Sequence, residues 1–330
     1  MKKTLIIIIP GLLAITALMT FLLVFTRRSV RQIEQQGAST TTYDGHYVLI
    51  SDDRSDQWRS MYAAADKAAE EAGVSLEWLG DDLPAQYTVS DCLRIAAAAR
   101  ADGIILYPGE EKDETELIGS AAQQGIPVIT VLEDDADSER VSFIGLNSYQ
   151  MGEMYGNRIL ENLTEGENRI LVLQNTSSDN PASALMYSQM VQTVEQGRGE
   201  NQEAVFAAHE ISTVTSFDAE EDIRDIFLMG EDLPNILICL DLISTECVCQ
   251  ALVDYNKVGD VTVIGYYASD KVIDGLKKGL IDSTLYLDAE EIGTRCIEAL
   301  NEYRELGHVS SYFNVGMKMI TPQTVGEIAM

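Results

Sequence analysis

The 330-residue sequence contains few histidines, few cysteines and few basic residues. Its three histidines, His46, His209 and His308, are far apart in the chain, which disfavours a histidine-based metal site or catalytic triad. The five cysteines have no regular spacing, so a disulfide-stapled secreted domain is excluded. Lys and Arg total 23 against 53 Asp and Glu, giving a formal net charge of -30. This charge disfavours binding to nucleic acid or to an anionic membrane surface.

The common catalytic and cofactor motifs are also missing. No G-x-G-x-x-G, P-loop, G-x-S-x-G or H-E-x-x-H motif occurs, so we expect no bound cofactor and no metal. Cys247-Val248-Cys249 is a lone pair that fits buried small side chains better than a zinc site. The acidic loop 133–139 could hold calcium but lacks the glycine turn of an EF-hand. Carboxylates are plentiful, so a glycosidase-like pair remains an open alternative.

The N-terminus carries one long apolar run. Residues 4–25 contain no charge and are long enough to cross a bilayer, which takes about 20 residues. Arginines follow at once, so we predict an uncleaved transmembrane signal anchor over 4–26, in preference to a cleaved signal peptide. Residues 27–45 are polar and are predicted to form a flexible stalk. The flanking charges weakly favour a cytoplasmic location for the large domain.

The remaining chain alternates apolar strand candidates with amphipathic helices. Ten strands are predicted at 47–51, 76–79, 103–107, 128–132, 142–145, 170–173, 204–207, 236–240, 261–265 and 284–287. Near-continuous apolar runs suit strands of a parallel sheet, which are buried on both faces. The βα plan runs twice, over about 46–147 and 168–287, which predicts an α/β fold of two doubly wound parallel-sheet lobes. Two such lobes would enclose one shared cleft.

Ligands of such sheets bind at the carboxyl ends of the strands. The polar and aromatic candidates at these ends are Ser51, Asp52, Asp53, Ser55, Trp58, Tyr107, Glu133, Asn175, Asp241, Tyr266 and Tyr267. Aromatic rings can stack on sugar faces, while Asp and Asn bind hydroxyl groups. Simpler roles remain open for several of them: Trp58 as core, Tyr107 as a wedge against Pro108, and Asp241 as a helix cap.

Several segments together resemble a known family. They read VLIS, ADGIILYP, QGIPVITV, FIGLNSYQMG, VTVIGYY and GLKKGLIDSTLYLDAEEIG. The chain resembles the type I periplasmic binding proteins of the ribose/galactose class over about residues 46–322. The resemblance implies a three-stranded hinge with crossings near 147–149, 287–288 and 307–309. Lobe 1 would comprise 46–147 plus 288–308, and lobe 2 would comprise 148–287 plus 309–322. An anchor in place of a DNA-binding segment implies an extracytoplasmic domain, which overrides the flanking charges.

The resemblance also implies pocket residues. Trp58, Ser55 and Asp241 match the family's pattern, whereas Tyr107, Leu132-Glu133, Met186, Tyr267 and Leu287 replace its usual polar residues. The predicted ligand site therefore comprises Ser51, Asp53, Ser55, Trp58, Tyr107, Glu133, Asn175, Met186, Asp241 and Tyr267. Losing most of the family's arginines and aspartates argues against a simple pentose or hexose.

From these observations we expect a monomeric, non-enzymatic, membrane-tethered solute-binding protein of the cell envelope, with a sugar as its small-molecule ligand. Hinge closure on the ligand would be read by an ABC permease or a histidine kinase, and no nucleic acid would bind. One alternative is a docking or regulatory module with a degenerate cleft, supported by Leu132, Met186 and Leu287. The other is a hydrolase acting in the cleft.

Overall fold

A computed structural model describes residues 43–80, 87–109, 111, 113–175, 181–212, 216–228 and 233–327. Two compact units result, Met1–Asp44 and Gly45–Met330. The predicted span 4–26 and nearly all of the predicted stalk lie outside the described residues. Within the described part, no helix is long and apolar enough to cross a membrane.

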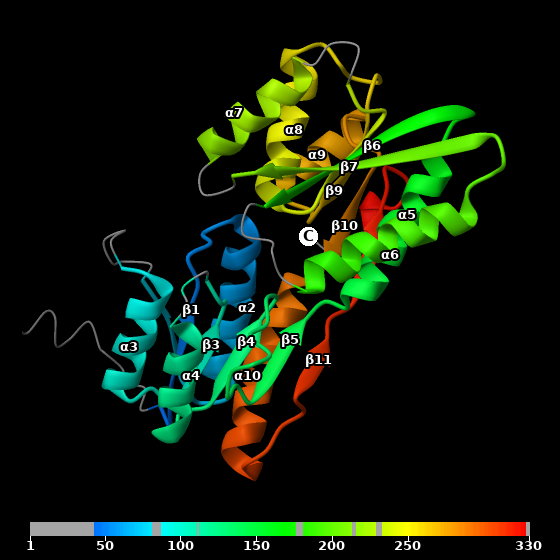
Figure 1. The fold of residues 1–330 in the computed structure, drawn as a ribbon. Helices are drawn as coiled ribbons and strands as arrows, with labels where there is room; N and C mark the ends of the chain where they lie inside the picture. Colours follow the sequence, from blue (N-terminus) through cyan, green and yellow to red (C-terminus); the bar gives the residue numbers. More distant parts are fainter. Residues whose placement is uncertain are drawn as a thin grey trace, which may run out of the picture. The chain divides into compact units, whose positions relative to one another are not determined.

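The unit from Gly45 contains two six-stranded sheets (Figure 1). The first has the order β11-β5-β4-β3-β1-β2. Its strands are β1 (His46–Ile50), β2 (Ser75–Leu79), β3 (Gly103–Leu106), β4 (Val128–Val131), β5 (Ser142–Gly145) and β11 (Tyr312–Asn314). All neighbours in this sheet are parallel. Its helices are α2 (Asp56–Glu71), α3 (Val89–Ala99), α4 (Glu114–Gln123) and α10 (Ala289–Leu306).

The second sheet has the matching order β12-β10-β9-β8-β6-β7. Its strands are β6 (Gly166–Asn175), β7 (Gln202–Ile211), β8 (Ile236–Cys239), β9 (Thr262–Tyr266), β10 (Ser283–Leu287) and β12 (Met317–Ile320). Only β12 runs antiparallel to its neighbour. Its helices are α5 (Ser148–Asn162), α6 (Pro181–Gly197), α7 (Ser216–Phe227), α8 (Leu242–Asp254) and α9 (Asp270–Lys278). The α/β fold with two parallel-sheet lobes is therefore as predicted, and all ten predicted strands are present.

Alternating strand residues explain why each sheet is covered on both faces. In β1, Val48 and Ile50 join a core with α3 and α4, while Tyr47 and Leu49 join a core with α2 and α10. Successive side chains of a strand point to opposite faces, so a wholly apolar strand requires helices on both sides. The second sheet repeats this plan, with α5 and α6 on one face and α7, α8 and α9 on the other.

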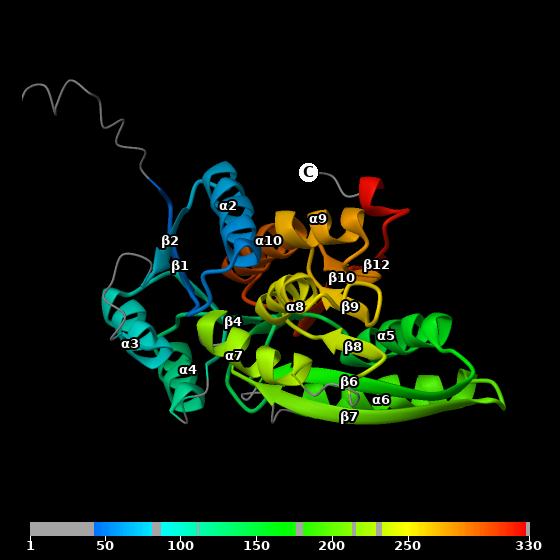
Figure 2. The ribbon, with the colours of Figure 1, turned by 90° about the horizontal axis from the view of Figure 1, so that it is seen from above.

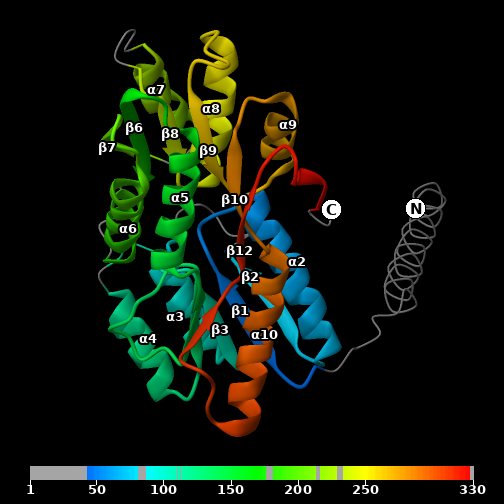
Figure 3. The ribbon, with the colours of Figure 1, turned by 90° about the vertical axis from the view of Figure 1, so that its right-hand side faces the viewer.

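Helix α10 lies alongside α2, far from it in sequence (Figure 3). Gly293 makes this close approach possible, because a Cβ atom there would lie 2.1 Å from the Met61 carbonyl oxygen. Helices α5 and α6 form a similar pair (Figure 2). At Gly152, a Cβ atom would lie 2.4 Å from the Met186 carbonyl oxygen. Both pairs therefore depend on a residue without a side chain.

One predicted crossing differs from the structure. The sequence placed the third crossing near 307–309 and assigned 309–322 to lobe 2. Strand β11 instead pairs with β5 of the first sheet, and β12 pairs with β10 of the second. The chain therefore passes between the sheets at Val315–Gly316. The crossing lies later in the chain because β11 forms backbone hydrogen bonds with β5, whose edge would otherwise carry unpaired backbone groups. In this pairing the Phe143 amide donates to the Ser311 carbonyl.

Candidate functional site

The segment between β1 and α2 brings four of the predicted residues together. The Asp53 carboxylate accepts a hydrogen bond from the Ser55 amide at 2.7 Å, and Ser51 Oγ accepts one from the Asp53 amide at 3.1 Å. The Trp58 side chain lies close enough to Asp53 to lower its pKa slightly, while burial, the largest cause, raises it. The Ser55 hydroxyl lies beside the same carboxylate but makes no hydrogen bond of good geometry among the described residues. This turn holds Asp53 and Trp58 in fixed positions at the carboxyl end of β1.

Trp58 contacts the aromatic residue that follows β3. Its ring meets the Tyr107 ring edge to face, with centroids 5.0 Å apart and an interplanar angle of 63°. Trp58 is only 2% exposed, so it serves as core as well as a wall of the site. Burial raises the pKa of Tyr107 well above its usual value, and the negative charges of Glu133 and Asp53 raise it further.

The two lobes share an unusual backbone feature at equivalent strand ends. Leu132 follows β4 and Tyr267 follows β9, and both have a φ of 64°. Each amide then donates to the neighbouring strand: Leu132 to Ile144 at 2.9 Å, and Tyr267 to Leu285 at 2.7 Å. A left-handed conformation in a non-glycine residue costs about 1–2 kcal/mol. Such strain persists where the surrounding structure holds it, and here it turns the chain sharply at the candidate site.

In the second lobe, Asp241 follows β8 and caps α8. Its carboxylate accepts from the Ser244 amide and from the Ser244 hydroxyl, both at 2.7 Å. The capping role that the sequence left open for Asp241 is therefore present. Burial raises its pKa, and the negative charge of Asp53 in the first lobe raises it further. Asp241 thus combines a structural role with a position facing the first lobe.

Side chains of α2 and of the β9 end meet directly across the lobes. The Gln57 side chain lies beside the Tyr266 hydroxyl and lowers its pKa, and the Ser60 side chain does the same for Tyr267. Gln57 and Ser60 were not predicted. Gln57 is 6% exposed, but a polar residue in the first turn of a helix looks solvent-facing in sequence. The one sequence feature that could have indicated a site position for Gln57 is that it directly precedes Trp58.

The three remaining predicted residues are Glu133, Asn175 and Met186, and each has different surroundings. Glu133 follows Leu132, and its charge raises the pKa of both Tyr107 and Tyr266, which places it with them. Asn175 ends β6 and pairs with Ile211. Met186 is 5% exposed and belongs to the core between α5, α6 and the second sheet. Its backbone packs closely against Gly152 of α5, and its place in the ligand site remains a prediction.

Burial and acidic neighbours shift the pKa values of three groups at the candidate site. Burial is the largest cause of the raised pKa of Asp53, of Asp241 and of Tyr266. The largest charge contributions to these three pKa values come from acidic groups, among them Asp52 and Glu133. Within the described part of the chain, no cluster of three or more His, Cys, Asp or Glu could hold a metal ion.

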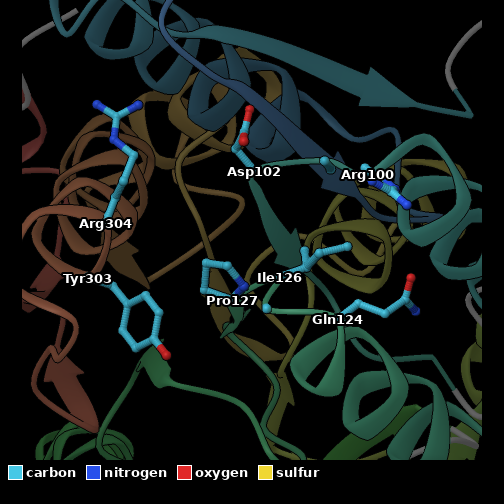
Figure 4. A pocket seen from close by; sticks show the side chains of 9 residues that line it. Arg100, Asp102, Gln124, Ile126, Pro127, Tyr303 and Arg304 are labelled. Atoms are coloured by element: carbon cyan, nitrogen blue, oxygen red, sulfur yellow. The ribbon is translucent and has the colours of Figure 1, made fainter.

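A cavity of about 680 Å³ lies in the first lobe, at the end of the strands opposite to the candidate site (Figure 4). Ala101 and Asp102 precede β3, and Ile126 and Pro127 precede β4, so this cavity opens at the amino ends of the strands. Arg304 of α10 also lines it. The candidate site lies at the carboxyl ends of the strands, where ligands of such sheets bind, so this cavity is separate from it.

Comparison with known proteins agrees with this geometry. Residues 47–307 match the sequence profile of the periplasmic binding protein domain. The chain belongs to the periplasmic binding protein family. Members of this family are solute-binding proteins, and the domain is extracytoplasmic. A comparison with curated protein sequences gave no match.

Several solved structures share the fold of this periplasmic binding protein. GanP, a glucose-galactose binding protein from Geobacillus stearothermophilus, is 26% identical, with a TM-score of 0.72 over 84% of this chain and 98% of GanP. The XylFII-LytSN complex gives 23% identity and the same TM-score and coverage. An ABC transporter solute-binding protein from Burkholderia graminis, solved with D-arabinose, is 17% identical, with a TM-score of 0.76 over 88% of this chain and 99% of its own.

Proposed function

We propose that this periplasmic binding protein binds a small sugar-like solute between its lobes and is not an enzyme. The observation that carries the proposal is the approach of residues at the strand ends and at the start of α2 from one lobe to strand-end residues of the other. Asp53, Trp58 and Tyr107 come from the first lobe, and Asp241 and Tyr266 from the second. Aromatic faces beside buried carboxylates are the combination that binds polyhydroxylated rings.

The described arrangement corresponds to lobes in contact. Gln57 and Ser60 on α2 lie beside the side chains of Tyr266 and Tyr267, and one apolar core runs through residues of both sheets. A ligand that binds better to this arrangement than to a separated one would shift the population toward it. The lobe bounds proposed are 46–147 with 288–314, and 148–287 with 317–322.

The proposal includes a membrane partner and a tether. The apolar run 4–26 would anchor the domain on the extracytoplasmic side, and an ABC permease or a sensor kinase would read the ligand-bound form. Relatives support both kinds of partner: one is named an ABC transporter solute-binding protein, and another was solved in a complex named XylFII-LytSN. A single anchored chain serves a neighbouring membrane receptor at least as well as a permease.

A thermal-shift screen against pentoses, hexoses and disaccharides tests the proposal. A ligand that binds only the native state raises the Tm with its concentration. At a ligand concentration about 100 times the Kd, the stabilisation is about 2.7 kcal/mol. We expect a concentration-dependent rise with at least one sugar. No rise with any sugar would reject the proposal.

A second candidate is a docking module with a degenerate site. The observation in its favour is the continuous apolar core across the lobes, which includes Leu173, Leu287 and Ala289. If the lobes never separate, added solutes would leave the Tm unchanged while a membrane partner still binds. The thermal-shift screen therefore separates the two functions.

A further inference from the structure

The two second-lobe residues of the proposed site lie on separate segments that meet at one buried hydroxyl. Asp241 follows β8, and Tyr266 ends β9. The hydroxyl of Thr245, on α8, donates to the Asp241 backbone carbonyl at 2.7 Å and accepts the Tyr266 backbone amide at 3.0 Å. Thr245 is fully buried. One side chain therefore bridges the main chains of both site residues.

The Tyr266 amide takes its acceptor from a side chain because the sheet ends before it. The parallel pairing of β9 with β8 reaches only Ile264. The next amide along the chain, that of Tyr267, donates to the Leu285 carbonyl on the opposite side, in β10. A backbone amide that is buried without an acceptor is costly, so the Thr245 hydroxyl takes the place of a β8 carbonyl.

The Thr245 side chain is fixed by its contact with Gly265. A Cβ atom at residue 265 would lie 2.5 Å from the Thr245 methyl carbon, so the threonine fits this closely only against a glycine. Branching at Cβ also restricts the rotamers of threonine. The hydroxyl is therefore held in the orientation in which it reaches both Asp241 and Tyr266.

Two further buried hydroxyls hold the same strand end from other directions. From α5, the Tyr155 hydroxyl donates to the Gly265 carbonyl at 3.1 Å. From β10, the Thr284 hydroxyl donates to the Tyr267 carbonyl at 2.6 Å. Tyr155 and Thr284 are as fully buried as Thr245, so solvent does not compete for these hydrogen bonds. The carboxyl end of β9 is therefore held on three sides.

The Asp241 carboxylate is held by the neighbouring residue. One oxygen accepts the Ser244 amide and the other accepts the Ser244 hydroxyl, both at 2.7 Å. Each carboxylate oxygen has a second lone pair, so both can also accept from a ligand hydroxyl. Because Thr245 joins the main chain at Asp241 to that at Tyr266, the carboxylate and the phenol keep one spacing.

We propose that Thr245 is a positioning residue of the ligand site, whose hydroxyl sets Asp241 and Tyr266 at a fixed spacing before a solute arrives. This proposal rests on the proposed function, because it concerns the same site. Thr245 acts through the main chain and needs no contact with the solute. A site that is ordered in advance binds more tightly than one that must be ordered on binding.

The test compares Thr245→Val, which keeps the shape and removes the hydroxyl, with Thr245→Ser, which keeps the hydroxyl. The full chain is titrated by calorimetry with D-galactose, D-arabinose and any other sugar that raises the wild-type Tm in the thermal-shift screen. The temperature is one at which each variant is folded. We expect the Kd to rise at least about tenfold in Thr245→Val and to stay within about threefold of wild type in Thr245→Ser.

Hydrogen exchange measured by mass spectrometry gives a second readout that needs no ligand. The peptide that contains Tyr266 should exchange at least about tenfold faster in Thr245→Val, relative to peptides of the first lobe, because its amide has lost an acceptor. Thr245→Ser should restore the wild-type rate.

Thr193, on α6, provides the matched control. Its hydroxyl also donates to the carbonyl four residues earlier, that of Gln189 at 2.8 Å, and its Cβ also packs closely against a glycine, Gly156. Thr193→Val therefore makes the same chemical change within the α5–α6 pair, and it should leave the Kd unchanged. If Thr245→Val fails to fold, Tyr155→Phe removes another hydroxyl that holds the β9 end, and it should raise the Kd at least about threefold.

The outcomes are distinct. A weaker Kd in Thr245→Val, recovered in Thr245→Ser and absent in Thr193→Val, supports the positioning role. If a sugar binds Thr245→Val as tightly as wild type, or if exchange at Tyr266 does not change, the positioning role is overturned and the solute-binding function stands. Equal weakening in Thr193→Val also overturns it, since loss of stability would explain both. If no sugar binds the wild type, the proposed function and the positioning role are both rejected.

Discussion

The pH dependence of stability should depend strongly on Glu114, at the start of α4. Glu114 is 3% exposed, and one carboxylate oxygen accepts the Gly109 amide at 2.8 Å. The other oxygen is buried without a hydrogen-bond partner among the described residues. Burial is the main cause that raises the pKa of Glu114 from 4.5 to about 7, with a smaller contribution from the charges of Glu111 and Asp113.

The sign follows from proton linkage. The native state holds the Glu114 proton more tightly than the unfolded chain does, so this group stabilises the fold fully below a pH of about 4.5. The contribution is lost as the pH rises through about 7. A pKa difference of this size corresponds to about 3 kcal/mol of unfolding free energy.

Glu114→Gln removes the titration while keeping an acceptor for Gly109. Urea denaturation at a series of pH values should show the wild-type unfolding free energy falling by about 3 kcal/mol relative to the variant across this range. Other titrating groups are shared by both proteins and largely cancel. Glu116→Gln, at an exposed glutamate of the same helix, should follow the wild type. Parallel curves for wild type and Glu114→Gln would refute the reasoning.

Three further predictions concern packing and capping. Trp58→Ala should lower the unfolding free energy by about 3–5 kcal/mol and remove any sugar-dependent rise in Tm, since Trp58 is both core and site wall; a full sugar response in this variant would remove it from the site. Gly293→Ala should cost at least about 1–3 kcal/mol in urea denaturation because its Cβ would collide with Met61, whereas Gly326→Ala, with open space around it, should cost nothing measurable. Asp241→Ala should cost about 1–2 kcal/mol through loss of the α8 cap, and Asp241→Asn should restore most of it; equal losses would contradict the capping role.

The fold could be predicted because its signals are local. Apolar runs such as 103–106 and 236–239 become strands buried on both faces, and glycines such as Gly279 end helices in the left-handed conformation. The position of β11 could not be predicted in the same way. Its three residues carry no strong pattern, and their sheet is decided by the open edge of β5.

The sequence could place Asp53, Tyr107 and Asp241 near the carboxyl ends of strands, because each lies within three residues of a strand that an apolar run predicts. The site was not predictable where a helix presents a side chain across the lobes. Gln57 and Ser60 lie on α2, and only the approach of the β9 end makes them inter-lobe contacts. For Met186, the sequence could not show that its side chain packs into the core beside α5 and the second sheet.

The most direct test of solute binding between the lobes uses Trp58 as a reporter. The chain has two tryptophans, so Trp78→Phe leaves Trp58 as the single fluorophore. Titrating this variant with a sugar that raises the Tm should give a saturable change in emission, with the same Kd as calorimetry. A sugar that raises the Tm but leaves Trp58 emission unchanged would contradict binding at this site.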